Sequence, residues 1–197
     1  MSSDLRINYL LIQTLVPSKG KIFADFACGF GKQGRQIRSF CSPNYLVGLD
    51  IWKPYLLEVK QNKIYDDLVL ADITNLPFKN KSVDVSCACE VIEHLYHSDC
   101  EKFLASLENI SKEKVIISTP NYEYKQGIVR GNINEKHVSV WKDSYFKRNG
   151  YKVKGIGILI KGHSVCNLPI IGKIMGKFLS YGLFTKIAEL MICIKKL

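Results

Sequence analysis

The sequence predicts an α/β fold, a doubly wound, mostly parallel sheet of seven strands with helices on both faces. Short apolar segments alternate along the chain with segments of helical periodicity, which is typical of parallel sheets. Four successive apolar segments end at or beside an acidic residue, as expected if their carboxyl ends share one edge. The length of 197 residues suits a single domain with a hydrophobic core, and no fixed-period repeat indicates a solenoid.

The N-terminal elements follow from local patterns. Apolar residues spaced on one helical face predict a helix over 4–16. Residues 21–26 predict a strand, and the glycine-containing turn after it leads into a helix over 31–40. Residues 44–51 predict a second strand, followed by a helix over 52–61 whose proline fits a first turn.

The middle of the chain supplies three more strands. Residues 67–73 predict the third strand and residues 82–91 the fourth, with a helix over 97–110 after it. Residues 114–120 are nearly all apolar or β-branched, which favours a fifth strand that is covered on both faces of the sheet.

The C-terminal part begins with a polar, glycine-containing stretch over 121–136, which we expect to lie over the strand ends like a lid. A helix is expected over 138–150, a sixth strand over 151–159 and a seventh over 189–197. Between the last two strands, residues 167–181 predict an inserted amphipathic helix. Its apolar face either packs on the domain as a wall of the substrate pocket or lies on a membrane surface.

The charge distribution and the cysteine content limit the classes of function that the sequence allows. Residues 1–110 hold 12 basic and 13 acidic side chains, whereas residues 111–197 hold 16 basic and 5 acidic ones. This basic excess either attracts anions, such as phosphorylated molecules, lipid headgroups or nucleic acid, or serves solubility. The seven cysteines include no C-x-x-C pair and fit no zinc spacing, so we expect reduced, mostly buried thiols and no metal.

The first residues of the chain do not resemble a signal peptide. No stretch has the roughly 18 uncharged apolar residues of a membrane-spanning helix. We therefore expect a cytoplasmic protein, with peripheral membrane contact through 167–185 if the inserted helix lies on a membrane.

Acidic residues gather at the predicted carboxyl edge of the sheet. Asp25 ends the first strand and precedes a glycine-rich turn, where the backbone can approach a ligand closely. The helix after such a turn favours phosphate, but an acid at the strand tip repels phosphate and favours a cationic ligand. Asp50, Asp72 and Glu90 stand at or near the ends of the next three strands, so we expect one site along this edge.

The segment ADFACGFG resembles the D-x-G-x-G-x-G signature of class I S-adenosylmethionine-dependent methyltransferases. The resemblance implies a Rossmann-like methyltransferase sheet and S-adenosylmethionine as the cofactor. Ala27 replaces the first glycine of the signature, which implies either less room beside the methionyl part or a negative φ at this position. The cofactor contacts that the resemblance implies for this turn are Asp25, Ala27, Cys28, Gly29 and Gly31.

Later segments resemble the same family in the same order. Asp50 in GLDI would accept hydrogen bonds from the ribose hydroxyls, and Ile51 would pack on the adenine. Asp72 in ADITNLPF would receive the adenine amino group, and Ile73 would line the base. SVDVSCACEVIEHL is similar to the methyltransferase type 11 and 12 group that includes quinone-biosynthesis O-methyltransferases, which places Glu90 at the methionyl end and the transfer site.

The resemblance implies transfer of a methyl group to a small-molecule, lipid or lipid-linked glycan acceptor, and we expect methylation at oxygen. Glu90 and His137 are the candidate catalytic residues, because a neutral histidine can take the proton of a hydroxyl group. We expect His94 to form structural hydrogen bonds instead.

Three other functions are compatible with parts of the sequence. Residues 29–34 form a G-x-G-x-x-G with Asp50 beyond it, as in dinucleotide oxidoreductases, but that class does not require acids at 25 and 72. A noncatalytic S-adenosylmethionine-binding protein of the same fold is disfavoured because it need not keep Asp50 and Asp72. An RNA methyltransferase fits the basic charge. However, no Asn/Asp-Pro-Pro-aromatic tetrad follows the fourth strand, which disfavours methylation of base amino groups, and we do not expect a nucleic-acid partner.

We expect one methyltransferase domain over 1–197. It would comprise an N-terminal helix over 1–17, a cofactor-binding half over 18–120 and a substrate-side half over 121–197 with an insertion over 158–186. The sequence indicates neither the methyl acceptor itself nor the oligomeric state.

Overall fold

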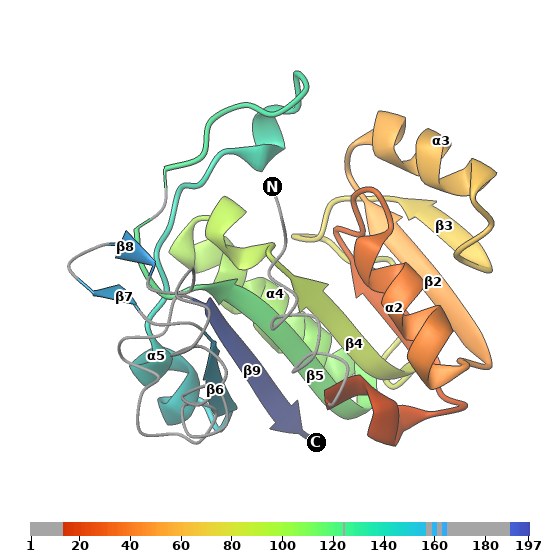
Figure 1. The fold of residues 1–197 in the computed structure, drawn as a ribbon. Coiled ribbons are helices and arrows are strands. Elements are labelled where there is room, and N and C mark those ends of the chain that lie inside the picture. The colour runs from red at the N-terminus through yellow and green to blue at the C-terminus, as the bar shows by residue number, and fades with distance from the viewer. Residues whose placement is uncertain (1–13, 124, 157–158, 161–162, 165–189) are drawn as a thin grey trace, which may run out of the picture.

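The computed structural model describes residues 14–123, 125–156, 159–160, 163–164 and 190–197. Within them the chain forms a seven-stranded sheet with helices on both faces (Figure 1). The strands of this sheet are β1 (Ile22–Phe26), β2 (Tyr45–Asp50), β3 (Asp67–Leu70), β4 (Val83–Cys89), β5 (Ser111–Pro120), β6 (Lys152–Ile156) and β9 (Leu190–Lys196). A separate pair is formed by β7 (Leu159–Ile160) and β8 (His163–Ser164).

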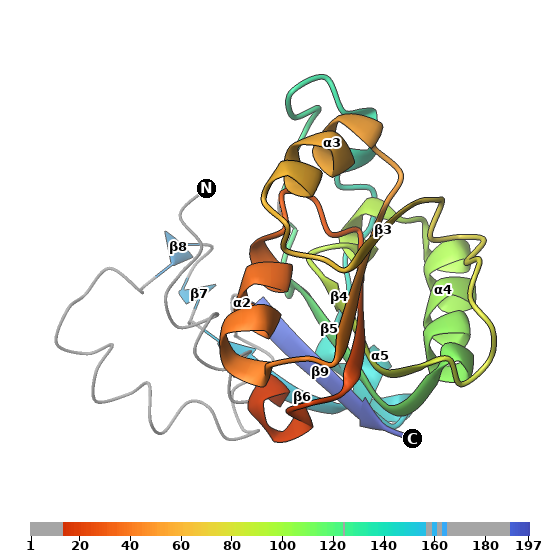
Figure 2. The same ribbon diagram turned by 90° about the vertical axis from the view of Figure 1, so that its right-hand side faces the viewer.

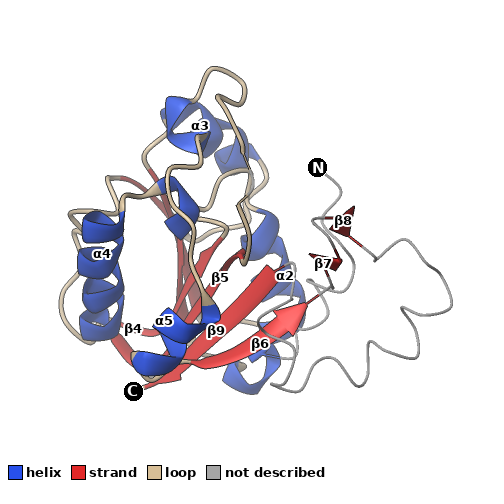
Figure 3. Ribbon diagram, turned by 90° about the vertical axis from the view of Figure 1, so that its left-hand side faces the viewer, coloured by secondary structure: helices blue, strands red, loops and turns tan. Residues whose placement is uncertain are grey.

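The main helices are α2 (Lys32–Cys41), α3 (Lys53–Gln61) and α4 (His97–Ile110). Views along the sheet show α2 on one face and α4 on the other (Figure 2 and Figure 3). The shorter helical segments are η1 (Val16–Ser18), η2 (Ile92–His94), η3 (Ile133–Glu135) and α5 (Asp143–Arg148).

The strand order is β3-β2-β1-β4-β5-β9-β6. β1 to β5 pair in parallel, and β9 lies antiparallel between β5 and β6. The winding direction reverses between β1 and β4, and doubly wound sheets place ligands beyond the strand ends at such a point. The predicted seven-stranded, mostly parallel sheet is confirmed.

The sheet is buried on both faces because apolar side chains alternate between two clusters. On one face Phe23 of β1 packs in a cluster with Ile37 of α2 and Val59 of α3. On the other face Phe26 of the same strand packs edge-on against Phe103 of α4, with ring centroids 6.0 Å apart. This two-sided burial holds the strands in register, so the loops that follow them start from a rigid edge.

The helix predicted over 138–150 is shorter than expected, since only α5 is helical. The residues before α5 are extended because the N–H groups of Val138 and Ser139 donate to the carbonyl of Glu93, at 2.9 and 3.1 Å. Tertiary hydrogen bonds therefore replace the first turns that local periodicity predicts.

The strand predicted over 67–73 ends early, at Leu70. Asp72 lies in the turn that follows, and its Oδ1 accepts the N–H of Thr74 at 2.8 Å. Aspartate favours such turns because its side chain can bond the backbone two residues on. The strand therefore ends where the hydrogen bond within the turn replaces the hydrogen bonds between strands.

Some predictions fall outside the described residues. The inserted helix over 167–181 lies there, as do Cys166 and nearly all of the helix over 4–16. The other six cysteines are free thiols, buried except for the half-buried Cys89, as predicted. Among the described helices, none is both long and apolar enough to cross a membrane.

Candidate active site

A pocket opens above the carboxyl ends of β1, β2, β3 and β4. With its open mouth it contains about 780 Å³ of empty space. Asp50, Asp72, Glu90 and Glu135 line it, and no lysine or arginine is among its described lining residues. This negative charge favours a cationic ligand over a phosphate. The other lining residues are Ala27, Gly29, Ile51, Ile73, Thr74, Val91, His94, Leu95, Asn132 and Asn134.

The turn after β1 is built from residues in the left-handed region. The φ angle is 52° at Ala27, 50° at Gly29 and 72° at Gly31. The suggestion of a negative φ at Ala27 is therefore wrong, and this residue carries strain of roughly 1–2 kcal/mol that glycine would avoid. No atom lies within 4 Å of a Cβ placed on Gly29, so the space above the turn is open to a ligand.

Asp50 ties the turn to the end of β2. Its Oδ2 accepts the N–H of Gly29 at 2.9 Å, and its Oδ1 accepts the N–H of Trp52 at 2.8 Å. The residue is only 5 % exposed, and burial raises the pKa of its carboxyl group. Each carboxylate oxygen keeps a further lone pair, so the geometry is compatible with the predicted hydrogen bonds from ribose hydroxyls.

Two isoleucines stand on neighbouring loops of the pocket. Ile51 follows β2 and is 43 % exposed, and Ile73 follows β3. A flat base between them would remove apolar surface from water. Asp72 beside them uses Oδ1 for the N–H of Thr74, so Oδ2 is the oxygen that could meet an amino group. This end of the pocket therefore suits an adenine.

Asp25 lies beneath the turn rather than in the pocket. It is 1 % exposed, and its Oδ2 accepts a hydrogen bond from the hydroxyl of Tyr65 at 2.6 Å. Burial raises the pKa of Asp25 to about 7. Cys28 and Gly31 also lie outside the pocket lining, so the three residues are placed to support the turn, and a direct cofactor contact from them stays a prediction.

The ring of Tyr65 fills the space below the turn. A Cβ added to Gly34 would lie 2.3 Å from the Tyr65 hydroxyl, and one added to Gly48 would lie 2.9 Å from its ring. Glycine at both positions lets Tyr65 lock the start of α2 against β2. Tyr65 could not be predicted as part of the site from the sequence, because it lies in a loop between α3 and β3 and belongs to no motif.

Two carboxylates lie beyond the end of β4, of which Glu90 is exposed and Glu93 is buried. Glu90 has a φ of 56°, and its Oε1 accepts a hydrogen bond from the Ser118 hydroxyl at 2.7 Å. Glu93 is 2 % exposed, and its Oε2 accepts a hydrogen bond from the Thr119 hydroxyl at 3.0 Å. Desolvation by the surrounding protein raises the pKa of Glu90, and burial together with the charge of Glu90 raises the pKa of Glu93 well above its usual range.

Two histidines stand beside these carboxylates. His94 lines the pocket, and its Nδ1 donates to the carbonyl of Lys136 at 3.2 Å. Burial lowers the pKa of His94 to about 4, so its ring is neutral at neutral pH. The centroid of the His137 ring lies 4.7 Å from that of His94. His137 itself is not among the residues that line the pocket.

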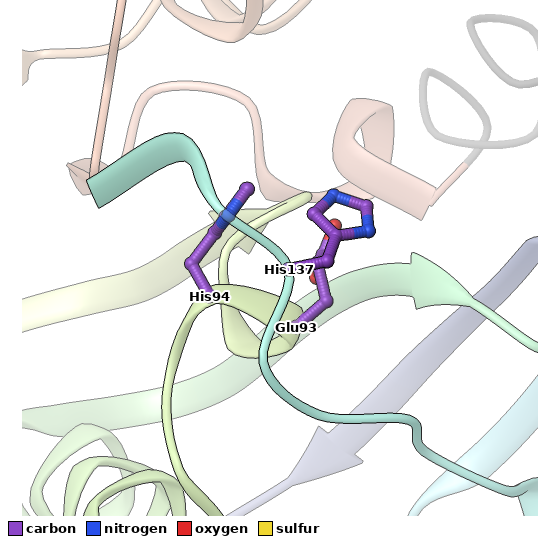
Figure 4. A group of neighbouring side chains, drawn as sticks. All are labelled: Glu93, His94 and His137. Carbon is purple, nitrogen blue, oxygen red and sulfur yellow. The ribbon is translucent and has the colours of Figure 1, made fainter. Parts of the chain in front are cut away.

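Glu93, His94 and His137 form one cluster (Figure 4). Each offers a donor atom, and these atoms lie within 4.8 Å of one another. The first two belong to η2, whereas His137 belongs to the loop that crosses it. The expectation of no metal was based on the spacing of the cysteines and not on Glu93, His94 and His137. Adjacent Glu and His are visible in the sequence, but the distant His137 could be joined to them only by the fold.

The loop over 121–136 crosses the mouth of the pocket, to which three of its residues contribute side chains. The guanidinium of Arg130 lies 4.6 Å from the ring centroid of Phe30, in the turn after β1. Arg130 also pairs with Glu58 of α3 at 3.9 Å. These contacts join the loop to both sides of the site, which is the position predicted for a lid.

Comparison with known proteins identifies related chains. Residues 24–118 match the family model described as methyltransferase domain. An uncharacterized protein of Methanocaldococcus jannaschii is 28 % identical over 167 residues, which cover 84 % of this chain and 67 % of that protein.

Solved structures share the fold. A methyltransferase dependent on S-adenosylmethionine from Archaeoglobus fulgidus has a TM-score of 0.63 at 15 % identity, and the match covers 96 % of this chain and 94 % of that one. Magnesium protoporphyrin IX methyltransferase from Synechocystis, solved with bound S-adenosylmethionine, has a TM-score of 0.57 at 13 % identity and covers 98 % of this chain and 82 % of that one. The similarity to quinone-biosynthesis enzymes stays a prediction. Residues 24–118 of the chain belong to the methyltransferase domain family, and the chain has the fold of class I S-adenosylmethionine-dependent methyltransferases.

Proposed function

We propose that this chain transfers the methyl group of S-adenosylmethionine to a hydroxyl oxygen of a small-molecule acceptor. The observation that carries the proposal is the set of side chains at the transfer end, where Glu90 and His94 line the pocket and Glu93 and His137 stand behind them. A hydroxyl must lose its proton as it is methylated, whereas a neutral amine need not lose one beforehand. A dense set of proton-accepting groups at this end therefore favours an oxygen acceptor.

The cofactor supplies an already activated methyl group, so the protein has mainly to position the two reactants. Asp50, fixed by two backbone N–H groups, would hold the ribose. Ile51 and Ile73 would flank the adenine, which leaves the methionyl part over the open space at Gly29. The loop over 121–136 would then cover the pocket and exclude water during transfer.

The acceptor would enter at the end formed by η2. Glu90 is oriented there by the Ser118 hydroxyl, and His94 by the Lys136 carbonyl. His137 is the base that the sequence predicts. Because His94 rather than His137 lines the pocket, we assign the acceptor hydroxyl to the histidine pair and not to His137 alone.

The lipid and lipid-linked glycan acceptors depend on residues 167–185, which lie outside the described part of the chain. Nothing in the described pocket requires a lipid, so the small-molecule acceptor is the one we propose. Peripheral membrane contact and cytoplasmic location stay expectations from the sequence.

Labelled cofactor tests the proposal. The protein is incubated with S-adenosylmethionine labelled at the methyl group and an extract of its host, and the labelled product is isolated. We expect a small product whose label survives mild alkali, as an ether does and a methyl ester does not. A product destroyed by ribonuclease would support the RNA methyltransferase instead, and cofactor binding with no labelled product would support a noncatalytic binding protein.

A further inference from the structure

We propose that Glu93, His94 and His137 bind one divalent transition-metal ion beside the cofactor pocket, and that this ion binds the acceptor hydroxyl. The metal site itself is inferred from these three residues alone. The role of the ion toward the acceptor deepens the proposed function and depends on it.

The three side chains can surround a single ion. Their donor atoms lie within 4.8 Å of one another. Three nitrogen or oxygen ligands about 2.0–2.2 Å from one zinc-like ion lie about 3.4–3.8 Å from one another. A closing movement of about 1–1.4 Å would therefore bring all three into contact with one ion.

His94 and Glu93 form the kind of additional hydrogen bonds that the side chains of metal ligands usually form. A metal-binding histidine usually donates its other ring N–H to a carbonyl, and a metal-binding carboxylate accepts a further hydrogen bond. His94 donates Nδ1–H to the Lys136 carbonyl at 3.2 Å, which leaves Nε2 as its donor atom for an ion. Glu93 accepts from the Thr119 hydroxyl at 3.0 Å.

The backbone fixes the loop of His137 against Glu93. The N–H groups of Val138 and Ser139 both donate to the Glu93 carbonyl, at 2.9 and 3.1 Å. These bonds shorten α5 relative to the sequence-based prediction, and they place the residue before them over η2. The cluster is therefore assembled by main-chain bonds rather than by side-chain contact alone.

The negative charge of the carboxylates near the cluster also favours a bound cation. Glu93 is buried, and its side chain accepts a hydrogen bond from the Thr119 hydroxyl. Glu90 beside it is exposed, and the nearby positive charge of Lys32 partly offsets the rise in its pKa that desolvation causes. In the described part of the chain, no lysine or arginine forms an ion pair with Glu93. Buried carboxylates are costly unless a positive charge compensates them. A divalent ion would supply that charge.

The ligand set selects the kind of ion. Two imidazoles beside one carboxylate favour first-row transition metals such as manganese, cobalt or zinc over magnesium and calcium, which prefer oxygen ligands. Three protein ligands leave coordination positions open. Because His94 also lines the cofactor pocket, an open position would face the acceptor.

An ion there would lower the pKa of a bound hydroxyl. The proton would pass to water, the oxygen would form a bond to the methyl carbon, and the carbon–sulfur bond of the cofactor would break. The histidines would then act as ligands rather than as a base. This distinguishes the proposal from a mechanism in which His137 removes the proton.

Manganese binding tests the site without any cofactor or acceptor. The full chain is freed of metal with a chelator and titrated with Mn²⁺, and the free ion is followed by electron paramagnetic resonance. We expect one bound ion per chain, and at least about a hundredfold weaker binding in His137→Ala. The matched control is His97→Ala, which removes an exposed histidine that packs on Trp141 outside the cluster and should bind Mn²⁺ normally.

Cofactor affinity serves as the folding check, because His137→Ala should bind S-adenosylmethionine as the unmodified chain does. If that variant fails to fold, Thr119→Val tests the same site through Glu93 and should weaken Mn²⁺ binding roughly 10- to 100-fold. Absence of Mn²⁺ binding, or equal affinity in the cluster variants, would overturn the metal site. If Mn²⁺ binds but a chelator leaves the rate of methyl transfer unchanged, the role toward the acceptor is overturned while the site stands.

Discussion

Replacing Asp50 by asparagine removes one negative charge from the site and keeps the size of the side chain. In the structure both carboxylate oxygens of Asp50 accept hydrogen bonds from backbone N–H groups, from Gly29 at 2.9 Å and from Trp52 at 2.8 Å. The amide of asparagine has one oxygen and one NH₂ group, and the NH₂ group cannot accept. One of the two N–H groups therefore loses its partner, and one hydrogen-bond acceptor for the ribose is lost as well.

The two losses have different magnitudes and affect different measurements. A buried N–H group without a partner costs about 1–3 kcal/mol, which lowers the free energy of unfolding of the cofactor-free protein. A hydrogen bond from a ribose hydroxyl to a charged group is worth about 1.5–3 kcal/mol, which appears in the binding of S-adenosylmethionine. The second value corresponds to a dissociation constant about 10- to 150-fold higher.

Isothermal titration calorimetry measures the dissociation constant, and urea denaturation measures the free energy of unfolding. The matched control is Asp84→Asn, because Asp84 accepts the N–H of Ile22 at 2.8 Å at the opposite end of β1. We expect this control to lose stability and to bind S-adenosylmethionine normally. If Asp50→Asn binds S-adenosylmethionine as tightly as the unmodified chain, the ribose contact at Asp50 is refuted.

Three further predictions concern the turn after β1 and its support. Ala27→Gly should raise the free energy of unfolding by about 1 kcal/mol in urea denaturation, since φ is 52° there, and an unchanged or lower value would contradict the strain. Gly34→Ala should lower it by at least about 1–3 kcal/mol, because the new Cβ would lie 2.3 Å from the Tyr65 hydroxyl. The carboxyl of Asp25 ionises near 3.8 when unfolded and about 7 when folded, so the folded state keeps a proton that the unfolded state has lost. Stability should therefore fall as the pH rises from 4 to 7, by up to about 4 kcal/mol from this group, and Asp25→Asn should show a shallower fall in thermal melts across this range. Equal slopes in the two proteins would contradict the buried, protonated Asp25.

The fold was predictable because the central strands, such as β1, β2 and β4, are buried on both faces and so have recognisable apolar sequences. The acids at the strand ends were also visible, since parallel strands bring their carboxyl ends together. Residues such as Asp50 and Asp72 therefore reach the pocket as predicted.

The environment of each acid was not predictable in the same way. Asp25 accepts a hydrogen bond from Tyr65, which reaches it from a loop far along the chain, and this contact places Asp25 beneath the turn while its predicted contact with the cofactor stays a prediction. The histidine pair has the same origin, since main-chain bonds from the loop of His137 to Glu93 help to bring His137 beside His94. Contacts between distant loops carry no local sequence signal, and these contacts decide which polar groups share a site.

A crystal structure of the chain with S-adenosylhomocysteine is the most direct test of the site. We predict ribose hydroxyls within hydrogen-bond distance of the Asp50 carboxylate, adenine between Ile51 and Ile73, and the sulfur directed toward Glu90 and His94. A nucleoside bound away from the ends of β1, β2 and β4 would contradict the account.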